Sequence, residues 1–113
     1  MKKQERIENT VTEYKRSFED CKPKSWLKTI VAFANTNGGC LLFGIDDATR
    51  EVIGIDFPQT VLSKISELLS SRVTPIPRYT IQETYIPSVS SPCIEVVVEN
   101  GPNYPYYYVH EGT

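Results

Sequence analysis

Residues 28–47, KTIVAFANTNGGCLLFGIDD, constrain the fold more than any other stretch of the chain. Apolar residues recur at helical spacing from about Pro23 to Asn35, and Pro23 suits the first turn of a helix. The NTNGG that follows ends this helix, with Gly38 or Gly39 available for the left-handed conformation that closes many helices. CLLFGI is then a continuous apolar run, which is typical of a strand covered on both faces.

A strand is also predicted before this helix, because TVTEYKRSF is rich in β-branched and aromatic residues. A strand, a helix and a second strand in succession imply a parallel pair joined by a crossover. After the second strand, DDATRE is predicted to turn the chain and EVIGID to return as the partner strand of a hairpin. A second helix is predicted from about Pro58 to Arg72, because Pro75 and Pro77 block any continuation.

Three further strands are predicted in RYTIQETYI, CIEVVVE and YPYYYV, separated by PSVSSP and NGPN. The predicted order is therefore β-α-β-β-α-β-β-β. This order implies both parallel and antiparallel pairs of strands. It favours an α/β (α+β) domain, with a mixed sheet and two main helices packed on it. A chain of 113 residues is long enough for one such domain, spanning residues 1–113, and too short for two cores.

The charge is distributed unevenly along the chain. The net charge is −2, yet residues 1–28 hold eight of the twelve lysines and arginines. A basic N-terminal segment on an acidic body could meet the phosphates of a nucleic acid, although a solvated surface explains the same charges. The candidate phosphate contacts are Lys2, Lys3, Arg6, Lys15, Arg16, Lys22, Lys24 and Lys28.

Several function classes find little support in the composition. No apolar run has the roughly 18 residues of a membrane span, and the charged N-terminus lacks the apolar region of a secretory signal. The three cysteines match no disulfide framework or CxxC metal pattern, and His110 is the one histidine. These features predict a cytoplasmic protein that does not associate with membranes.

Three carboxylates form the first candidate site. Glu13 and Lys15 share one face of a predicted strand, and Asp47 follows the end of the CLLFGI strand. If Glu8 folds back beside Glu13, the three acids could converge on a divalent metal ion, with Lys15 at a phosphate. The alternative is local: Asp46 and Asp47 open a turn, where aspartate hydrogen-bonds to its own backbone, and the glutamates lie on the surface.

Two other segments are candidate contacts for a nucleic acid. The NTNGG turn could contact a phosphate, but a helix C-terminus presents the wrong dipole end to an anion, which favours helix capping. The tyrosines of NYPYYYV could stack on bases, or they could form a half-buried strand or an interface between subunits. These tyrosines are Tyr104, Tyr106, Tyr107 and Tyr108.

Four motifs follow one another in the chain: Glu8-x4-Glu13-Tyr14-Lys15, AFANTNGG, LLFGIDD and VIGI. Together they resemble the Schlafen AlbA_2 domain, over essentially the whole chain. This family is described as a DNA-binding domain at the N-terminus of bacterial transcriptional regulators once labelled RecG-like helicases. The resemblance implies an Alba-like α/β fold. It also implies further regions after the domain, so we expect an N-terminal fragment of a longer protein.

The resemblance implies two functions. Bacterial members are described as DNA-binding regulators, which need no cofactor for binding. Animal Schlafens carry a metal-dependent endoribonuclease that cleaves tRNA and rRNA, and its acids fall on Glu8, Glu13 and Asp47. Those residues would be metal ligands for Mg²⁺ or Mn²⁺, with Lys15 supporting the phosphate. The animal nucleases join two such lobes, so a comparable groove here would require a homodimer.

The leading hypothesis is a DNA-binding module of a bacterial-type regulator, with DNA or structured RNA as the partner. The first alternative is a metal-dependent endoribonuclease. The second alternative is a protein-interaction or dimerisation module in which the tyrosine strand forms the interface.

Overall fold

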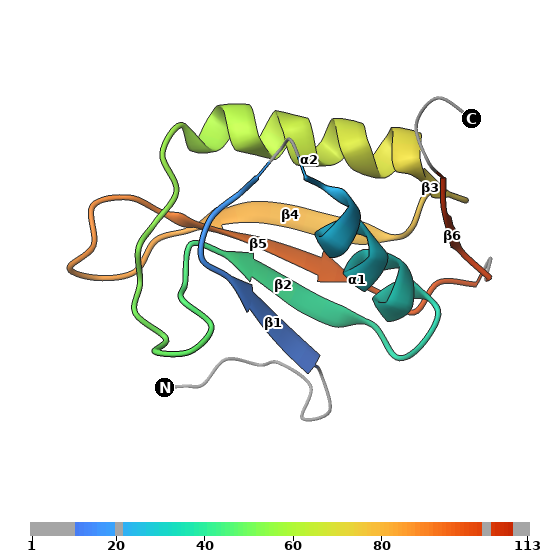
Figure 1. Cartoon of the computed structure of the whole chain (residues 1–113), viewed down its shortest axis with the longest axis horizontal. Helices are drawn as coiled ribbons and strands as arrows, with labels where there is room; N and C mark the ends of the chain where they lie inside the picture. The colour runs from blue at the N-terminus through green and yellow to red at the C-terminus, as the bar shows by residue number, and fades with distance from the viewer. Residues whose placement is uncertain (1–10, 20–21, 103–104, 110–113) are drawn as a thin grey trace.

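The computed structural model describes residues 11–19, 22–102 and 105–109 of the chain. Within these residues, helices and strands follow in the order β-α-β-α-β-β-β-β (Figure 1). The helices are α1 (Lys24–Ala34) and α2 (Pro58–Arg72). The strands are β1 (Val11–Lys15), β2 (Gly39–Phe43), β3 (Val73–Thr74), β4 (Tyr79–Thr84), β5 (Cys93–Val98) and β6 (Tyr107–Tyr108).

Four strands form the main sheet, in the order β1-β2-β5-β4. β1 and β2 are parallel, with Glu13 opposite Leu41, and this confirms the crossover predicted from the sequence. β5 is antiparallel to both β2 and β4, so the sheet is mixed as predicted. β3 and β6 pair separately in a short antiparallel ladder.

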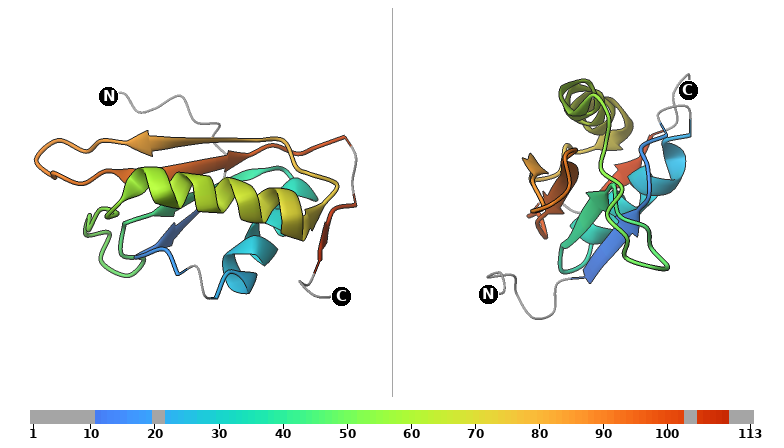
Figure 2. Two further views of the ribbon diagram at one scale, coloured as in Figure 1. Left: turned by 90° about the horizontal axis from the view of Figure 1, so that it is seen from above. Right: turned by 90° about the vertical axis from the view of Figure 1, so that its left-hand side faces the viewer.

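Both helices pack on one face of the main sheet (Figure 2). α1 contacts β2 and β5, and α2 contacts β4 and β5. Alternate residues of the central strands point toward the helices because side chains alternate between the two faces of a strand. The core between the sheet and the helices includes Leu27, Ile30, Leu41, Phe43, Ile65, Leu69, Ile94, Val96 and Val98. The interior of this domain is therefore a single core.

The end of α1 follows the sequence prediction. Gly38 has a φ of +83° and its N–H donates to the Phe33 carbonyl over 2.9 Å, so it supplies the left-handed residue beyond the helix. A Cβ atom at Gly38 would lie 2.6 Å from the Val98 carbonyl oxygen. Glycine is therefore required here by both the backbone conformation and the close approach of β5.

The prediction that EVIGID forms the second strand of a hairpin is wrong. The turn forms, but beyond it only one bridge, between Ile45 and Val52, joins the two arms in the described residues. The Gly44 carbonyl accepts both the Ile53 and Gly54 N–H groups, at 2.7 and 3.0 Å, which ends regular pairing. The Ile55 N–H then donates to the Pro92 carbonyl, so the chain leaves β2 for the connection before β5.

The observed order differs from the predicted one in a second place. β3 contains two residues and directly follows α2, which begins and ends at the predicted residues Pro58 and Arg72. Two residues carry too little pattern to predict a strand, and β3 forms because β6 lies beside it. The predicted order β-α-β-β-α-β-β-β therefore includes one strand before α2 that does not form and lacks the short strand β3 after it.

Two expectations about composition can be compared with the structure. In the described part of the chain, no helix is long and apolar enough to cross a membrane. Cys40 and Cys93 are both buried, and burial raises the pKa of Cys93. Cys21 lies outside the described residues.

The NTNGG turn fastens the C-terminal segment to α1. The Asn35 side-chain amide donates to the Tyr106 carbonyl over 3.0 Å, and the Tyr106 N–H donates to Asn35 Oδ1 over 2.7 Å. The Asn100 side chain also donates to the Thr36 carbonyl. Asn35 thus holds a segment 71 residues away in the sequence, and β6 lies beside the helices as a result.

We expect Asn35→Ala to lower the free energy of unfolding by about 1–2 kcal/mol, because both hydrogen bonds to Tyr106 are lost. The measurement is urea denaturation followed by circular dichroism. Asn37→Ala, an exposed change in the same turn, is the control and should alter the free energy by less than about 0.5 kcal/mol. Equal effects of the two changes would contradict the role assigned to Asn35.

Candidate nucleic-acid interface

Basic side chains from three separate elements line one depression of about 570 Å³. We call it the basic pocket, and its described lining consists of Lys22, Pro23, Lys24, Ser25, Lys28, Arg72 and Tyr108. Four of these residues are cationic and none is acidic. Three of the predicted phosphate contacts, Lys22, Lys24 and Lys28, therefore lie together.

The N-terminus of α1 forms one wall of the basic pocket. Pro23 is the N-cap residue and makes no side-chain cap hydrogen bond, and no acidic residue lies in the first turn of the helix. The partial positive charge of the helix dipole therefore adds to the lysine charges. Lys24 and Lys28 are four residues apart, so they project from the same side of α1. Their mutual repulsion is relieved when an anion lies between them.

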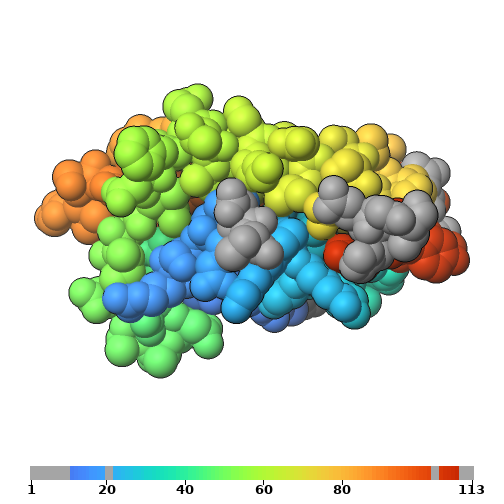
Figure 3. All heavy atoms as spheres, turned by 45° about the horizontal axis from the view of Figure 1, so that its top comes forward, coloured from blue at the N-terminus to red at the C-terminus, as the bar shows by residue number. Residues whose placement is uncertain are grey.

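The opposite wall comes from the end of α2 and from β6. Arg72 is the last residue of α2, where a cation complements the negative end of the helix dipole. The Val109 N–H donates to the Arg72 carbonyl over 2.7 Å, and Val73 pairs with Tyr108. The β3–β6 ladder thus brings Tyr108 beside Arg72. Figure 3 shows the face on which α2, α1 and the segment after β1 lie side by side.

Arg72 and Tyr108 line this pocket, and the sequence does not predict their place in it. In the sequence, Arg72 is the predicted end of a helix and Tyr108 is one of several tyrosines in a predicted strand. No local signal links them to Lys24, because the link depends on how α2 and β6 pack against α1. The paired β3 and β6 strands are the structural feature that joins them.

Two other predicted phosphate contacts, Lys15 and Arg16, do not line the basic pocket. Lys15 is at the end of β1, and its carbonyl accepts the Gly44 N–H over 2.7 Å, which extends the pairing of β1 with β2. Arg16 Nη1 lies 2.8 Å from Asp46 Oδ2, so this cation already has a carboxylate partner. Lys2, Lys3 and Arg6 lie outside the described residues.

The two aspartates after β2 have different environments. Asp46 Oδ1 accepts the N–H groups of Ala48 and Thr49 at 2.9 and 3.0 Å, and Asp46 Oδ2 accepts from Arg16. The Thr49 N–H and then Arg16 lower the pKa of Asp46 below its ordinary value, because both favour the ionised carboxylate. Asp46 therefore shapes the turn.

Asp47 lies in the same turn, and its side chain is more exposed than that of Asp46. The Asp47 side chain is 77% exposed, and the Arg50 guanidinium lies 3.6 Å from Asp47 Oδ1. Arg50 also lies over the Tyr14 ring, 4.1 Å from its centroid, and it donates to the Asp47 carbonyl. A partly neutralised, solvated carboxylate of this kind neither needs a metal ion nor prevents one from binding.

The proposed metal ligands are only partly placed. Glu13 is exposed on β1, opposite Leu41, and Glu8 lies outside the described residues. Among the residues that the structure describes, no group of three or more His, Cys, Asp or Glu side chains could hold a metal ion. Glu13 and Asp47 thus form no such site with their described neighbours, and the metal hypothesis depends on Glu8.

The tyrosines of the C-terminal segment do not share one role. Tyr106 is buried in the core, with 2% of its surface exposed. Tyr107 is 57% exposed, and Tyr108 is half-buried and lines the basic pocket. Tyr104 lies outside the described residues. Of the described tyrosines in this segment, Tyr107 and Tyr108 are therefore the ones that a ligand could contact.

Comparison with protein families gives a match over most of the chain. The family model described as Schlafen, AlbA_2 matches residues 8–113. An uncharacterized ATP-binding protein of Ureaplasma parvum is 44% identical over 48 residues. These residues are 42% of this chain and 14% of that protein, so the chain spans a small part of the relative's length.

Solved structures show the same fold. The N-terminal domain of a Nitrosomonas europaea protein, related by its name to the ATP-dependent DNA helicase RecG, matches with a TM-score of 0.70 and 23% identity. That match covers 95% of this chain and 76% of the other. A Corynebacterium diphtheriae protein matches with a TM-score of 0.55 and 17% identity, over 91% of this chain and 20% of the other. At these identities the likeness concerns the fold alone.

We expect Asp46→Ala to lower the melting temperature at neutral pH, because the turn loses its carboxylate acceptor. The pKa of Asp46 is depressed in the folded protein, so its stabilising contribution is present above the ordinary value of 3.8. That contribution is lost as the pH falls through the depressed pKa. Melting curves of the wild type and the variant should therefore converge as the solution is acidified.

The control for this prediction is Asp47→Ala, which removes an exposed carboxylate from the same turn. Its melting temperature should match that of the wild type at neutral pH. A larger effect of Asp47→Ala than of Asp46→Ala would show that the assignment of the two aspartates is reversed.

Proposed function

Since this chain belongs to the Schlafen AlbA_2 family, we propose that it is a nucleic-acid-binding module that holds the phosphate backbone of DNA in the basic pocket. The main support for this proposal is that one depression is lined by four cationic residues, Lys22, Lys24, Lys28 and Arg72. The proposed setting is a DNA-binding regulator. The RecG-related name of the Nitrosomonas europaea protein agrees with a role in nucleic-acid binding.

The residues of the basic pocket suit a phosphate diester. The lysines supply compact positive charges, and the guanidinium of Arg72 adds a further cation to the lining. Ser25 and Tyr108 add hydroxyl groups, and the first-turn N–H groups of α1 point along the helix dipole toward an anion. These groups recognise a phosphate without reading a base.

The charge distribution explains why the interface is local. The net charge of the chain is −2, so the rest of the surface does not attract a polyanion. Binding through a few cations releases condensed counterions from the nucleic acid, and affinity then falls steeply as salt is added. We therefore expect weak sequence preference and strong salt dependence from this pocket.

We expect the double change Lys24→Ala, Lys28→Ala to weaken DNA binding uniformly across sequences. The slope of log affinity against log salt should decrease by about 0.9 for each duplex phosphate contact that is lost. Fluorescence anisotropy of a labelled duplex, titrated at several salt concentrations, measures both quantities.

Arg78→Ala is the control for each single change, Lys24→Ala or Lys28→Ala, because Arg78 is an exposed cation just before β4 that does not line the basic pocket. An equal loss in both proteins would indicate general charge attraction and would contradict the proposed pocket. A stable dimer that ignores nucleic acid at low salt would instead support the dimerisation alternative.

The endoribonuclease hypothesis is tested with the same protein. Labelled tRNA is incubated with Mn²⁺ or with EDTA, alongside the double change Glu13→Ala, Asp47→Ala. Metal-dependent cleavage that is lost in this variant would favour the nuclease. Intact tRNA that migrates more slowly at low salt would favour the binding module.

A further inference from the structure

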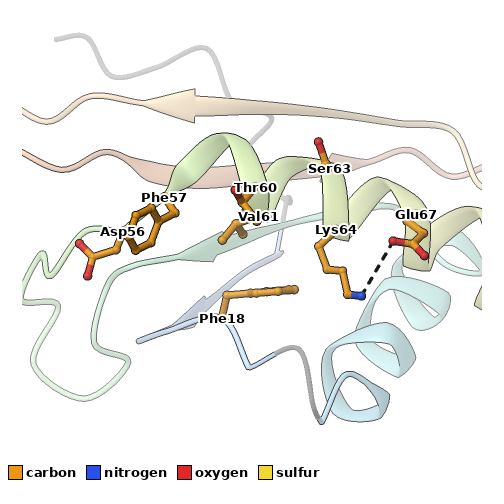
Figure 4. A pocket seen from close by; sticks show the side chains of 8 residues that line it. All are labelled: Phe18, Asp56, Phe57, Thr60, Val61, Ser63, Lys64 and Glu67. Atoms are coloured by element: carbon orange, nitrogen blue, oxygen red, sulfur yellow. Dashed lines mark ion pairs between the residues drawn. The ribbon is translucent and has the colours of Figure 1, made fainter.

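A second depression, of about 530 Å³, lies between α2 and the segment that follows β1. We call it the aromatic pocket, because two phenylalanines contribute to its walls (Figure 4). Its lining consists of Phe18, Asp56, Phe57, Thr60, Val61, Ser63, Lys64 and Glu67. None of these residues belongs to the basic pocket.

Phe57 is an unusual residue at the entrance of α2. Its φ and ψ are 54° and 55°, a left-handed conformation that bulky residues rarely adopt. Phe57 is 78% exposed, so little packing against the described residues offsets the backbone strain. Such a strained and exposed aromatic residue does not add to the stability of the fold. A ligand that packs on its ring is the better explanation for its place beside a pocket.

Phe18 forms a fixed wall of the same pocket. Its ring meets the Phe43 ring edge-on, with centroids 5.5 Å apart, and the Trp26 ring at 5.8 Å. Phe18 remains only half-buried despite these contacts, so part of its surface faces the pocket. The pocket therefore combines a rigid aromatic wall with an exposed phenyl ring at its edge.

The polar groups of the aromatic pocket favour a neutral ligand. Lys64 lies 3.9 Å from Glu67, and Asp56 adds a second carboxylate, so the lining does not attract a phosphate. Thr60 and Ser63 supply hydroxyl groups that can donate or accept hydrogen bonds. Carboxylates and hydroxyls around aromatic walls suit a flat heterocycle that carries amino and ring N–H groups. A nucleobase has this chemistry.

The position of the aromatic pocket relates it to the basic pocket. Phe18 faces α2 at one pocket and residues 22–28 lie near the end of α2 at the other, with Val61 and Lys64 lining the first and Arg72 the second. Arg72 is eleven positions after Val61, which corresponds to about 16 Å along α2. One flexible single strand can therefore reach both pockets, whereas bases within a duplex are stacked and paired.

We propose that the aromatic pocket receives one unpaired base of a single strand whose phosphates lie in the basic pocket. This inference rests on the proposed function, and it adds a preference for unpaired nucleic acid. Base stacking on an aromatic side chain tolerates any sequence, because every base has a π face. The two pockets together would favour single-stranded DNA or RNA without strong base selectivity.

The test compares Phe57→Gly and Phe57→Tyr with the wild type. Glycine adopts the left-handed conformation without strain, so Phe57→Gly should keep or raise the melting temperature. The same variant should bind a labelled single-stranded oligonucleotide about five- to a hundredfold more weakly, because it loses the stacking ring. Phe57→Tyr should retain the wild-type affinity. Tyr85→Ala removes another exposed aromatic ring that lines neither pocket, and it should leave the affinity unchanged.

A second probe isolates the contribution of the base. An oligomer of the same length whose residues are all abasic keeps the phosphates but offers nothing to stack. The wild type should prefer the base-containing strand, and Phe57→Gly should bind the two probes equally, with an unchanged salt slope. One result would overturn this inference and leave the proposed function standing: Phe57→Gly binds as the wild type does, while the Lys24→Ala, Lys28→Ala variant loses affinity. If neither variant alters binding, both proposals fail.

Discussion

The parallel pairing of β1 with β2 is the constraint on which the arrangement of this domain depends. Two parallel neighbours cannot be joined by a tight turn, so the chain between them must cross the sheet as α1. The crossover places the N-terminus of α1 after the end of β1, on the face of the sheet that α2 also covers. Both pockets arise where the segment leading into α1 lies against α2.

A few long-range contacts then complete the interface. Asn35 binds the backbone of Tyr106, and the β3–β6 ladder extends from the end of α2. These contacts bring Tyr108 to the lysines of α1, although some 80 residues separate them in the sequence. The chain carries an overall charge of −2. The positive charge of the basic pocket is therefore concentrated there by the way the chain packs.

The elements with strong local patterns were predictable. α2 begins and ends at the predicted residues, and α1 differs from its prediction by one residue at each end, because amphipathic spacing and prolines define a helix locally. The hairpin after β2 was not predictable. EVIGID has the composition of a strand, but Gly44 and Gly54 adopt positive φ angles and the chain pairs with Pro92 instead. The residues of a strand do not identify its hydrogen-bonding partner.

The family, the two helices, the parallel crossover and the clustering of basic residues near the N-terminus all follow from the amino-acid sequence. These features depend on residue spacing and on motifs that lie close together along the chain. Three features follow from packing instead: Arg72 and Tyr108 join Lys24, Asp46 rather than Asp47 holds the turn, and the exposed Phe57 lines the same pocket as Phe18. Each of these outcomes depends on which surfaces pack together, and that choice minimises the free energy of the whole chain rather than of any segment.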